Sequence, residues 1–164
     1  MRKEVVLRTT RGRVVIMDSI TKVVPEDKGS IVIAASHGGT SSGEFALEAP
    51  LALVVLNDAG IGKDDAGIAA LEMLQKRGVP CAMVSHDSAR IGDSLDMWES
   101  GVISRVNLAA KAIGLRPRQR LGLAGNLADL LEHLRPTLGA RRLKQVRVAH
   151  RAADLGSVRQ SRVE

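Results

Sequence analysis

The sequence predicts a small α/β domain of three layers, with a mainly parallel core sheet preceded by an N-terminal β-hairpin. Three short apolar segments rich in β-branched residues, near 30–36, 51–57 and 79–85, are typical of strands buried on both faces. Segments with helical character or turn residues separate these strands. Such alternation is typical of parallel strands joined by right-handed crossovers, although it does not give the order of the strands.

The predicted hairpin comes first in the chain. The segments EVVLRT (4–9) and RVVIMDSI (13–20) are both apolar and β-branched, and Gly12 lies in the turn between them. The strands of a hairpin are antiparallel, so this part of the sheet is expected to differ in direction from the three strands that follow.

Helices are predicted between and after the strands. The strongest prediction covers residues 63–78, where apolar residues recur at helical spacing, acidic residues come first and basic residues come last. A short helix is expected over 42–49, because Pro50 would end it. Two amphipathic helices are expected over 104–114 and 125–136, each with apolar side chains on one face.

Charge is distributed unevenly along the 164 residues. Residues 1–110 hold 12 Lys or Arg and 14 Asp or Glu, a net charge of −2, whereas residues 111–164 hold 12 and 4, a net charge of +8. We therefore expect an α/β domain over 1–138 and a basic C-terminal extension over 139–164. The extension has no strong period or large apolar face, which is typical of a loose or oligomer-contacting arm, so a homo-oligomer is expected.

Composition narrows the class of protein. The hydrophobic fraction of 45% is enough for a core, and no apolar run approaches the roughly 18 residues of a membrane span. The first residues lack the pattern of a secretory signal. Cys81, the single cysteine, cannot form an internal disulfide and is expected to be buried. We expect a cytoplasmic protein with no membrane partner.

Polar residues follow each of the three buried strands. The first strand is followed by SHGGTSSG, the second by NDAGIGKDDAG and the third by SHDSARIGDS, whereas the opposite ends read EDKG, EAP and KRGVP. Ligands of parallel α/β sheets bind outside the carboxyl ends of the strands. The sequence therefore predicts one polar pocket built from three loops, although loops of this kind also need glycines and helix caps for purely structural reasons.

The loop after the second strand does not match a phosphate-binding motif. A P-loop would need Gly at position 57 and Ser or Thr at position 64, but Asn57 and Asp64 stand there. We expect Asp58 and Lys63 to orient or polarise a substrate, and Asn57 and Asp64 to contact it. The alternatives are an ion pair between Lys63 and a neighbouring aspartate, and Asp64 as a helix cap.

The first loop offers a histidine for acid/base chemistry. Ser36 and His37 are adjacent on a strand and so point to opposite faces, which argues against a serine–histidine pair formed by these two. We expect His37 to act as a general acid/base or as a donor to a developing oxyanion, with Ser36 contacting the substrate and Gly38 and Gly39 bringing backbone N–H groups to the same atom. A histidine bonded at a strand end is the alternative.

The third loop supplies Ser88 and Arg90, which we expect to bind substrate. An arginine in this position suits a carboxylate, and its alternative role is an ion pair with Asp87 or Asp93. A metal site that includes His37, Asp58, His86 and Asp87 is a further alternative, since these are suitable ligands, although no metal-binding spacing supports it. No other cofactor is predicted.

The sequence thus favours a small-molecule enzyme, a hydrolase or lyase that acts on a small polar or anionic carbonyl or carboxylate compound. The catalytic residues would be His37, Asp58 and Lys63. The alternatives are a metal-dependent hydrolase and a non-catalytic module that binds RNA or an acidic partner through its basic tail. Nucleic acid is the less favoured partner, because the chain has one Phe, one Trp and no Tyr for stacking against bases.

Overall fold

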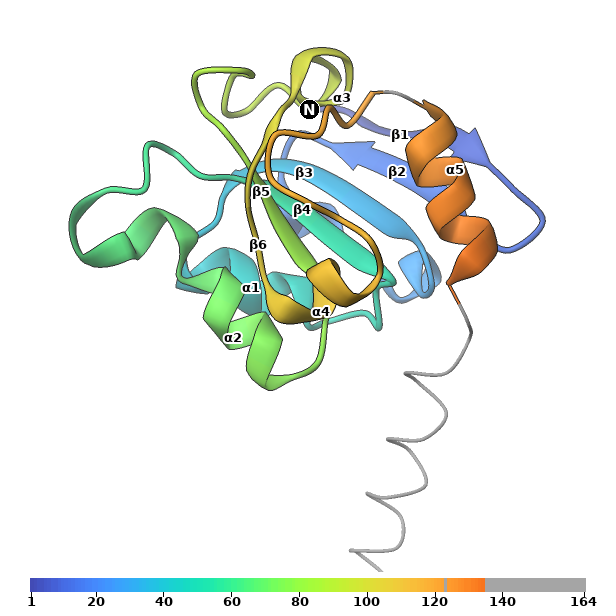
Figure 1. Cartoon of the computed structure of the whole chain (residues 1–164), viewed down its shortest axis with the longest axis horizontal. Helices are drawn as coiled ribbons and strands as arrows, with labels where there is room; N and C mark the ends of the chain where they lie inside the picture. Colours follow the sequence, from blue (N-terminus) through green and yellow to red (C-terminus); the bar gives the residue numbers. More distant parts are fainter. Residues whose placement is uncertain (123, 135–164) are drawn as a thin grey trace, which may run out of the picture. The chain divides into compact units, whose positions relative to one another are not determined.

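A computed structural model describes residues 1–122 and 124–134, and they form a six-stranded sheet with helices on both faces (Figure 1). The strands lie in sequence order, and the central four are parallel. The first and last strands are antiparallel to their neighbours. The strands are β1 (Lys3–Arg8), β2 (Arg13–Met17), β3 (Ile31–His37), β4 (Leu53–Asn57), β5 (Cys81–Val84) and β6 (Ile103–Val106). This confirms a small α/β domain with an N-terminal hairpin.

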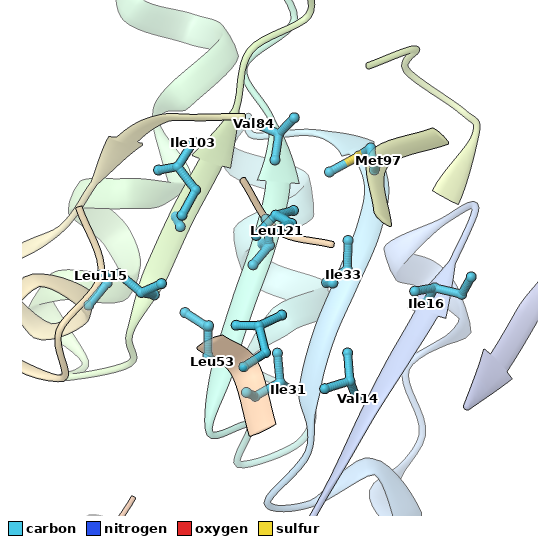
Figure 2. Packing of buried hydrophobic residues seen from close by; sticks show 14 of the residues in the cluster. Val14, Ile16, Ile31, Ile33, Leu53, Val84, Met97, Ile103, Leu115 and Leu121 are labelled. Carbon is cyan, nitrogen blue, oxygen red and sulfur yellow. The ribbon is translucent and has the colours of Figure 1, made fainter. Parts of the chain in front are cut away.

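Alternate side chains of the central strands enter two separate cores, one on each face of the sheet. In β3, Ile31 and Ile33 belong to one core, whereas Val32 and Ala34 belong to the other. Figure 2 shows the first of these cores, in which Met97 reaches the sheet from a helix. The central strands read as continuous apolar runs because both of their faces are covered.

The parallel crossovers all cover the same face. When neighbouring parallel strands follow one another in sequence, right-handed crossovers place every connection on one side. That side carries η1 (Ile20–Lys22), η2 (Pro25–Asp27), α1 (Thr40–Ala46), η3 (Lys63–Ile68) and α2 (Ala70–Lys76). The opposite core takes side chains from α3 (Ser94–Ser100), α4 (Leu108–Ala112) and α5 (Ala124–His133).

The predicted helix over 63–78 is wrong in its first half. Residues 63–68 form the irregular 3₁₀ segment η3, and the α-helix α2 starts only at Ala70. Asp64 and Asp65 have φ values of 55° and 57°, which lie in the left-handed region and cannot continue a right-handed helix. Of the three apolar residues that predicted the helix, Ile68 lies in η3, whereas Leu71 and Leu74 lie in the second half, where the helix does form.

The predicted helix over 104–114 is also wrong in its first half. Residues 103–106 form β6, which pairs antiparallel with β5, and α4 begins after the cap residue Asn107. The side chain of Asn107 accepts a hydrogen bond from the N–H of Ala110, as an N-cap does. The sequence analysis missed α3, which is capped by Asp93.

Residues 135–164 lie outside the described part of the chain, and with them the predicted basic extension over 139–164. Among the described helices, none is long and apolar enough to cross a membrane.

Candidate active site

The loops predicted to be polar share one edge of the sheet. The parallel strands β3, β4 and β5 end at His37, Asn57 and Val84, and the register pairs His37 with Asn57 and Asn57 with Val84. The carboxyl edge therefore brings together the start of each of the three loops. It also includes the residues that follow β2, from Asp18 to Thr21.

Asp58 and His86 form the most closely bonded pair at this edge. Asp58 is 3% exposed, and its Oδ1 lies 3.0 Å from Nδ1 of His86. The backbone N–H groups of Gly60 and His86 donate to the same oxygen, each at 3.0 Å. Because the carboxylate is fixed in this way, Nδ1 of the imidazole has a defined acceptor, and Nε2 is the nitrogen left for a ligand.

Hydrogen bonds keep the Asp58 carboxylate charged. Burial acts to raise the pKa of Asp58, but the Ser104 hydroxyl and the N–H groups of His86 and Gly60 outweigh burial and hold that pKa below its usual range. Asp58 is therefore an anion at neutral pH. An anion at Nδ1 orients the imidazole and stabilises the positive charge that the ring gains when Nε2 takes a proton.

The second nitrogen of His86 lies near a more exposed carboxylate. Its Nε2 lies 3.2 Å from Oδ1 of Asp87, whose side chain is 84% exposed. His86 itself is half exposed, with 48% of its side chain accessible. The sequence analysis cast His37 in the acid/base role, yet the repeated Ser-His pair at 85–86 was the signal that could have pointed to His86.

The segment after Asp58 has an unusual backbone. In Figure 1 it runs out to the left of the sheet before it returns as α2. It closes tightly, because Ile61 N–H donates to Asp58 C=O and Gly67 N–H to Ile61 C=O, both at 2.7 Å. Positive φ angles recur at Ala59, Gly60, Ile61, Gly62, Asp64 and Asp65. The value of 66° at the β-branched Ile61 costs on the order of 1–3 kcal/mol.

Lys63, Asp64 and Asp65 are all exposed on this segment. Among residues 1–122 and 124–134, Lys63 makes no ion pair with a carboxylate, so the salt bridge considered as an alternative does not form there. Asp64 is not a helix cap either, since α2 starts six residues later and has no side-chain cap. Lys63 thus keeps its ammonium group available to a ligand.

His37 has a bonding pattern opposite to that of His86. Its Nδ1 accepts a hydrogen bond of 3.1 Å from the N–H of Gly39, which leaves Nε2 as the N–H donor of the neutral ring. The N–H of Gly38 donates to Asn57 C=O at 2.8 Å. Both glycine N–H groups are therefore used within the protein, and the donor that this loop offers a ligand is His37.

A pocket of about 370 Å³ opens beside His37. Its walls are hydroxyl groups and a few apolar side chains, and its residues come from η1, β3, α1 and the loop after β5. They are Ser19, Ile20, Thr21, Ala35, Ser36, His37, Ser41, Ser42, Phe45, Ile91 and Gly92. The segment after β4 does not line this pocket, so two of the three predicted loops contribute to it and η1 takes the place of the third.

Ser36 and Ser42 differ in how their hydroxyl groups are used. Ser36 Oγ accepts a hydrogen bond of 2.9 Å from the N–H of Ile20, so it joins β3 to η1, and Ser36 lines the same pocket as His37. Ser42 is 3% exposed, and its hydroxyl has no hydrogen-bond partner among the described residues. Since Ser42 lines the pocket, its hydroxyl is available to whatever occupies the pocket. The sequence analysis did not include Ser42 among the residues expected to bind substrate.

The loop after β5 connects the Asp58–His86 pair with the pocket beside His37. It carries His86 near its start and Ile91 and Gly92, which line the pocket, near its end. The side chain of Asn57, which is fully buried, donates to Ala89 C=O at 3.0 Å, and Gly92 N–H donates to Ala35 C=O at 2.7 Å. Asn57 therefore holds the loop in place rather than facing a ligand.

Ser88 and Arg90, both predicted to bind substrate, are placed differently. The Ser88 hydroxyl donates to Ser85 C=O at 2.8 Å and accepts from Val102 N–H at 2.9 Å, so it joins this loop to the segment before β6. Arg90 is exposed, and in the described part of the chain its guanidinium forms no ion pair with Asp87 or Asp93. It remains available beside the pocket residue Ile91.

No group of three or more His, Cys, Asp or Glu side chains in the described ranges is arranged to hold a metal ion. Of the four residues considered as ligands, His86 contacts two: Asp58 lies at its Nδ1 and Asp87 lies at its Nε2. No protein-family model, curated protein or solved structure matches this chain.

Proposed function

We propose that this chain is a small-molecule enzyme, a hydrolase or lyase that acts on a small polar carbonyl or carboxylate compound by acid/base catalysis. The observation that carries the proposal is the buried Asp58 carboxylate bonded to Nδ1 of the half-exposed His86. In this arrangement His86 Nε2 is the general base, and Asp58 orients the ring and stabilises its charged form.

The reaction starts with removal of a proton from a water molecule or from a carbon next to a carbonyl group. His86 Nε2 takes this proton, and the imidazolium then donates it to the leaving group. Oδ1 of Asp87 lies 3.2 Å from Nε2 in the free protein, but a neutral ring that donates Nδ1–H to Asp58 has no proton at Nε2 to hold it, so the 84% exposed side chain gives way to the substrate. Neither step requires Asp87.

Three groups support substrate binding. The pocket beside His37 offers hydroxyl groups, including that of Ser42, to a small polar compound. Because Nδ1 of His37 accepts from Gly39, the Nε2–H of the neutral ring can donate to a carbonyl oxygen of the substrate. Arg90 and Lys63 form no salt bridge within the described residues, although the N–H of Arg90 and, to a lesser degree, its charge help to lower the pKa of Asp96, and both cations suit a substrate carboxylate.

A lone, fully buried cysteine suits a reducing compartment, so we place the reaction in the cytoplasm. A homo-oligomer stays a prediction, as does the alternative of a metal-dependent hydrolase. A binding role for the basic tail falls on residues outside the described part of the chain.

The test compares wild type with His86→Gln, and with Asp87→Asn as a matched control that changes the other carboxylate on the same ring. Hydrolysis of p-nitrophenyl acetate represents ester cleavage, whereas dehydration of malate represents lyase chemistry that starts with removal of a proton next to a carboxylate. We expect turnover with at least one probe, with kcat/KM lower by about 10²- to 10⁴-fold in His86→Gln. Asp87→Asn should retain the activity.

Two companion measurements complete the test. His37→Ala and Lys63→Ala should reduce activity while leaving the melting temperature nearly unchanged. Activity that survives dialysis against a chelator would separate this mechanism from a metal-dependent one. No turnover above the His86→Gln background with any probe, or an equal loss in Asp87→Asn and His86→Gln, would contradict the proposal.

A further inference from the structure

A second pocket lies at the amino edge of the sheet, away from the candidate active site. Because β2 and β3 are parallel, the turn that leads into β2 and the turn that leads into β3 meet at this edge. A Cβ atom built at Gly12 would lie 3.4 Å from the carbonyl oxygen of Gly29, so the two turns are nearly in contact. The open pocket that they form has a volume of about 320 Å³, and we call it the hairpin pocket. It is lined by Arg8, Thr9, Arg11, Gly12, Arg13, Lys28, Gly29 and Ser30.

The lining of the hairpin pocket is cationic. Four of its eight residues are Arg or Lys, and none is Asp or Glu. Two carboxylates lie nearby but do not neutralise it. Asp27, which is 1% exposed, is bonded to Lys3 at 2.7 Å and to Arg13 at 3.2 Å. Glu132 lies 3.7 Å from Arg11 and also accepts a hydrogen bond from Thr10.

The positive charges of Arg8 and Lys28 are not paired with a carboxylate in the described part of the chain. Neither makes an ion pair with any residue in the ranges 1–122 and 124–134. Like charges placed around one concavity repel each other, and an anion between them relieves that repulsion. The hairpin pocket therefore has the charge of a site for an anionic group.

Arg13 is held in a defined orientation at this pocket. Its Nε donates to Ser30 Oγ at 3.1 Å, and its Nη2 donates to Glu26 C=O at 2.6 Å and to Asp27. These bonds leave Nη1 as the part of the guanidinium without a partner in the described residues. A guanidinium fixed in this way loses little conformational freedom when it binds an oxyanion.

We infer that the hairpin pocket binds the phosphate group of a small phosphorylated compound, at a site separate from the candidate active site. A phosphate carries up to two negative charges and several acceptor oxygens, which match two uncompensated cations and an oriented guanidinium. Nucleic acid fits less well, since the pocket has no aromatic side chain for a base to stack on. The inference does not depend on the proposed function, because the two sites share no residue.

The experiment titrates the full chain with inorganic pyrophosphate and follows the backbone amide signals by NMR at constant, physiological ionic strength. Site-resolved signals are needed because the basic tail could also attract the probe. We expect shifts at Gly12, Gly29 and Ser30. The double variant Arg8→Gln/Lys28→Gln should weaken the binding seen at these signals by about tenfold for each cation removed.

The matched control is Arg105→Gln/Lys111→Gln, which removes two exposed cations from β6 and α4. It should bind pyrophosphate at the hairpin pocket as tightly as wild type. An absence of shifts at the three amides, or an equal loss of affinity in both double variants, would overturn the inference. So would saturation of the same amides by a single-stranded RNA oligonucleotide when pyrophosphate has no effect, since the site would then be a nucleic-acid contact.

Discussion

Asp27 and Asp58 are both buried aspartates, yet they lie at opposite edges of the sheet and are held in different ways. Asp27, at the amino edge, is bonded to the cations Lys3 and Arg13 and to the N–H of Val24. Asp58, at the carboxyl edge, is bonded to backbone N–H groups and to an imidazole. Figure 1 shows the hairpin that holds the partners of Asp27 on the far side of the sheet from the segment that follows Asp58.

The difference separates a structural carboxylate from one suited to catalysis. The two cations bonded to Asp27 come from β1 and β2, so the carboxylate ties η2 to the hairpin. The partner of Asp58 is a histidine whose second nitrogen remains partly exposed. A change at Asp27 should therefore alter stability, whereas a change at Asp58 should chiefly alter chemistry.

The largest effect is expected for Asp58→Asn. An amide at this position removes the negative charge next to Nδ1 of the imidazole. Its N–H₂ group can turn toward Nδ1, which favours the Nε2–H tautomer and leaves Nε2 unable to accept a proton. We expect kcat/KM on the active probe to fall by about 10²- to 10⁴-fold. Steady-state kinetics measure this fall, and Asp27→Asn is the control that should retain the activity. Equal kinetic losses in the two variants would remove the distinction between the two aspartates.

Asp27→Asn should have the larger effect on folding. It leaves two cations without their carboxylate, although both are partly exposed and can be hydrated, so we expect a loss of about 2–3 kcal/mol in the free energy of unfolding. Urea denaturation of wild type, Asp27→Asn and Asp58→Asn would measure it. A smaller loss in Asp27→Asn than in Asp58→Asn would show that the amino-edge ion pairs are not structural.

Gly67→Ala probes the segment that leads away from Asp58. An added Cβ would lie 2.5 Å from the carbonyl oxygen of Asp58 and 2.8 Å from that of Ile61, so the segment must open. We expect a loss of about 1–3 kcal/mol in stability, together with reduced activity. Gly78→Ala is the control: its φ is +67°, but nothing lies within 4 Å, so only the backbone strain of about 1 kcal/mol applies. Equal effects in the two variants would argue against tight closure at Gly67.

The smallest effect concerns acid stability. The pKa of Asp58 is lower in the folded chain than its ordinary value near 3.9, so the folded state holds its proton less tightly than the unfolded state. The resulting stability is complete above that ordinary value and is lost as the pH falls through the lower folded value. Thermal melts from neutral to strongly acidic pH should show a shallower fall for Asp58→Asn than for wild type. Parallel curves would contradict the bonding assigned to Asp58.

Much of the fold could be predicted, because the central strands are buried on both faces and read as apolar runs. The half-exposed strand 103–106 carries Ser104 and Arg105, so its composition resembles one face of a helix, and only pairing with β5 makes it a strand. The left-handed backbone at Asp64 and Asp65 has no local sequence signal beyond the flanking glycines. Propensity therefore favoured a helix where tertiary contacts and tight turns impose another shape.

The candidate site was predictable in position but not in pairing. The polar ends of β3, β4 and β5 placed it at the carboxyl edge, but side-chain hydrogen bonds decided that His86, not His37, contacts Asp58. The sequence predicted no site at the amino edge, because the segment EDKG by itself has two acidic residues and a single lysine. Strand register brings the arginines of the hairpin beside Lys28, and this register cannot be read from one segment of sequence.

The tautomers of His37 and His86 test the central claim most directly. A long-range ¹H–¹⁵N correlation spectrum, recorded at a pH where both rings are neutral, distinguishes Nδ1–H from Nε2–H in each ring. Bonding to Asp58 predicts Nδ1–H in His86, whereas the N–H of Gly39 predicts Nε2–H in His37. Asp58→Asn should shift His86 toward Nε2–H and leave His37 unchanged. Finding Nε2–H in wild-type His86 would contradict its assignment as the general base.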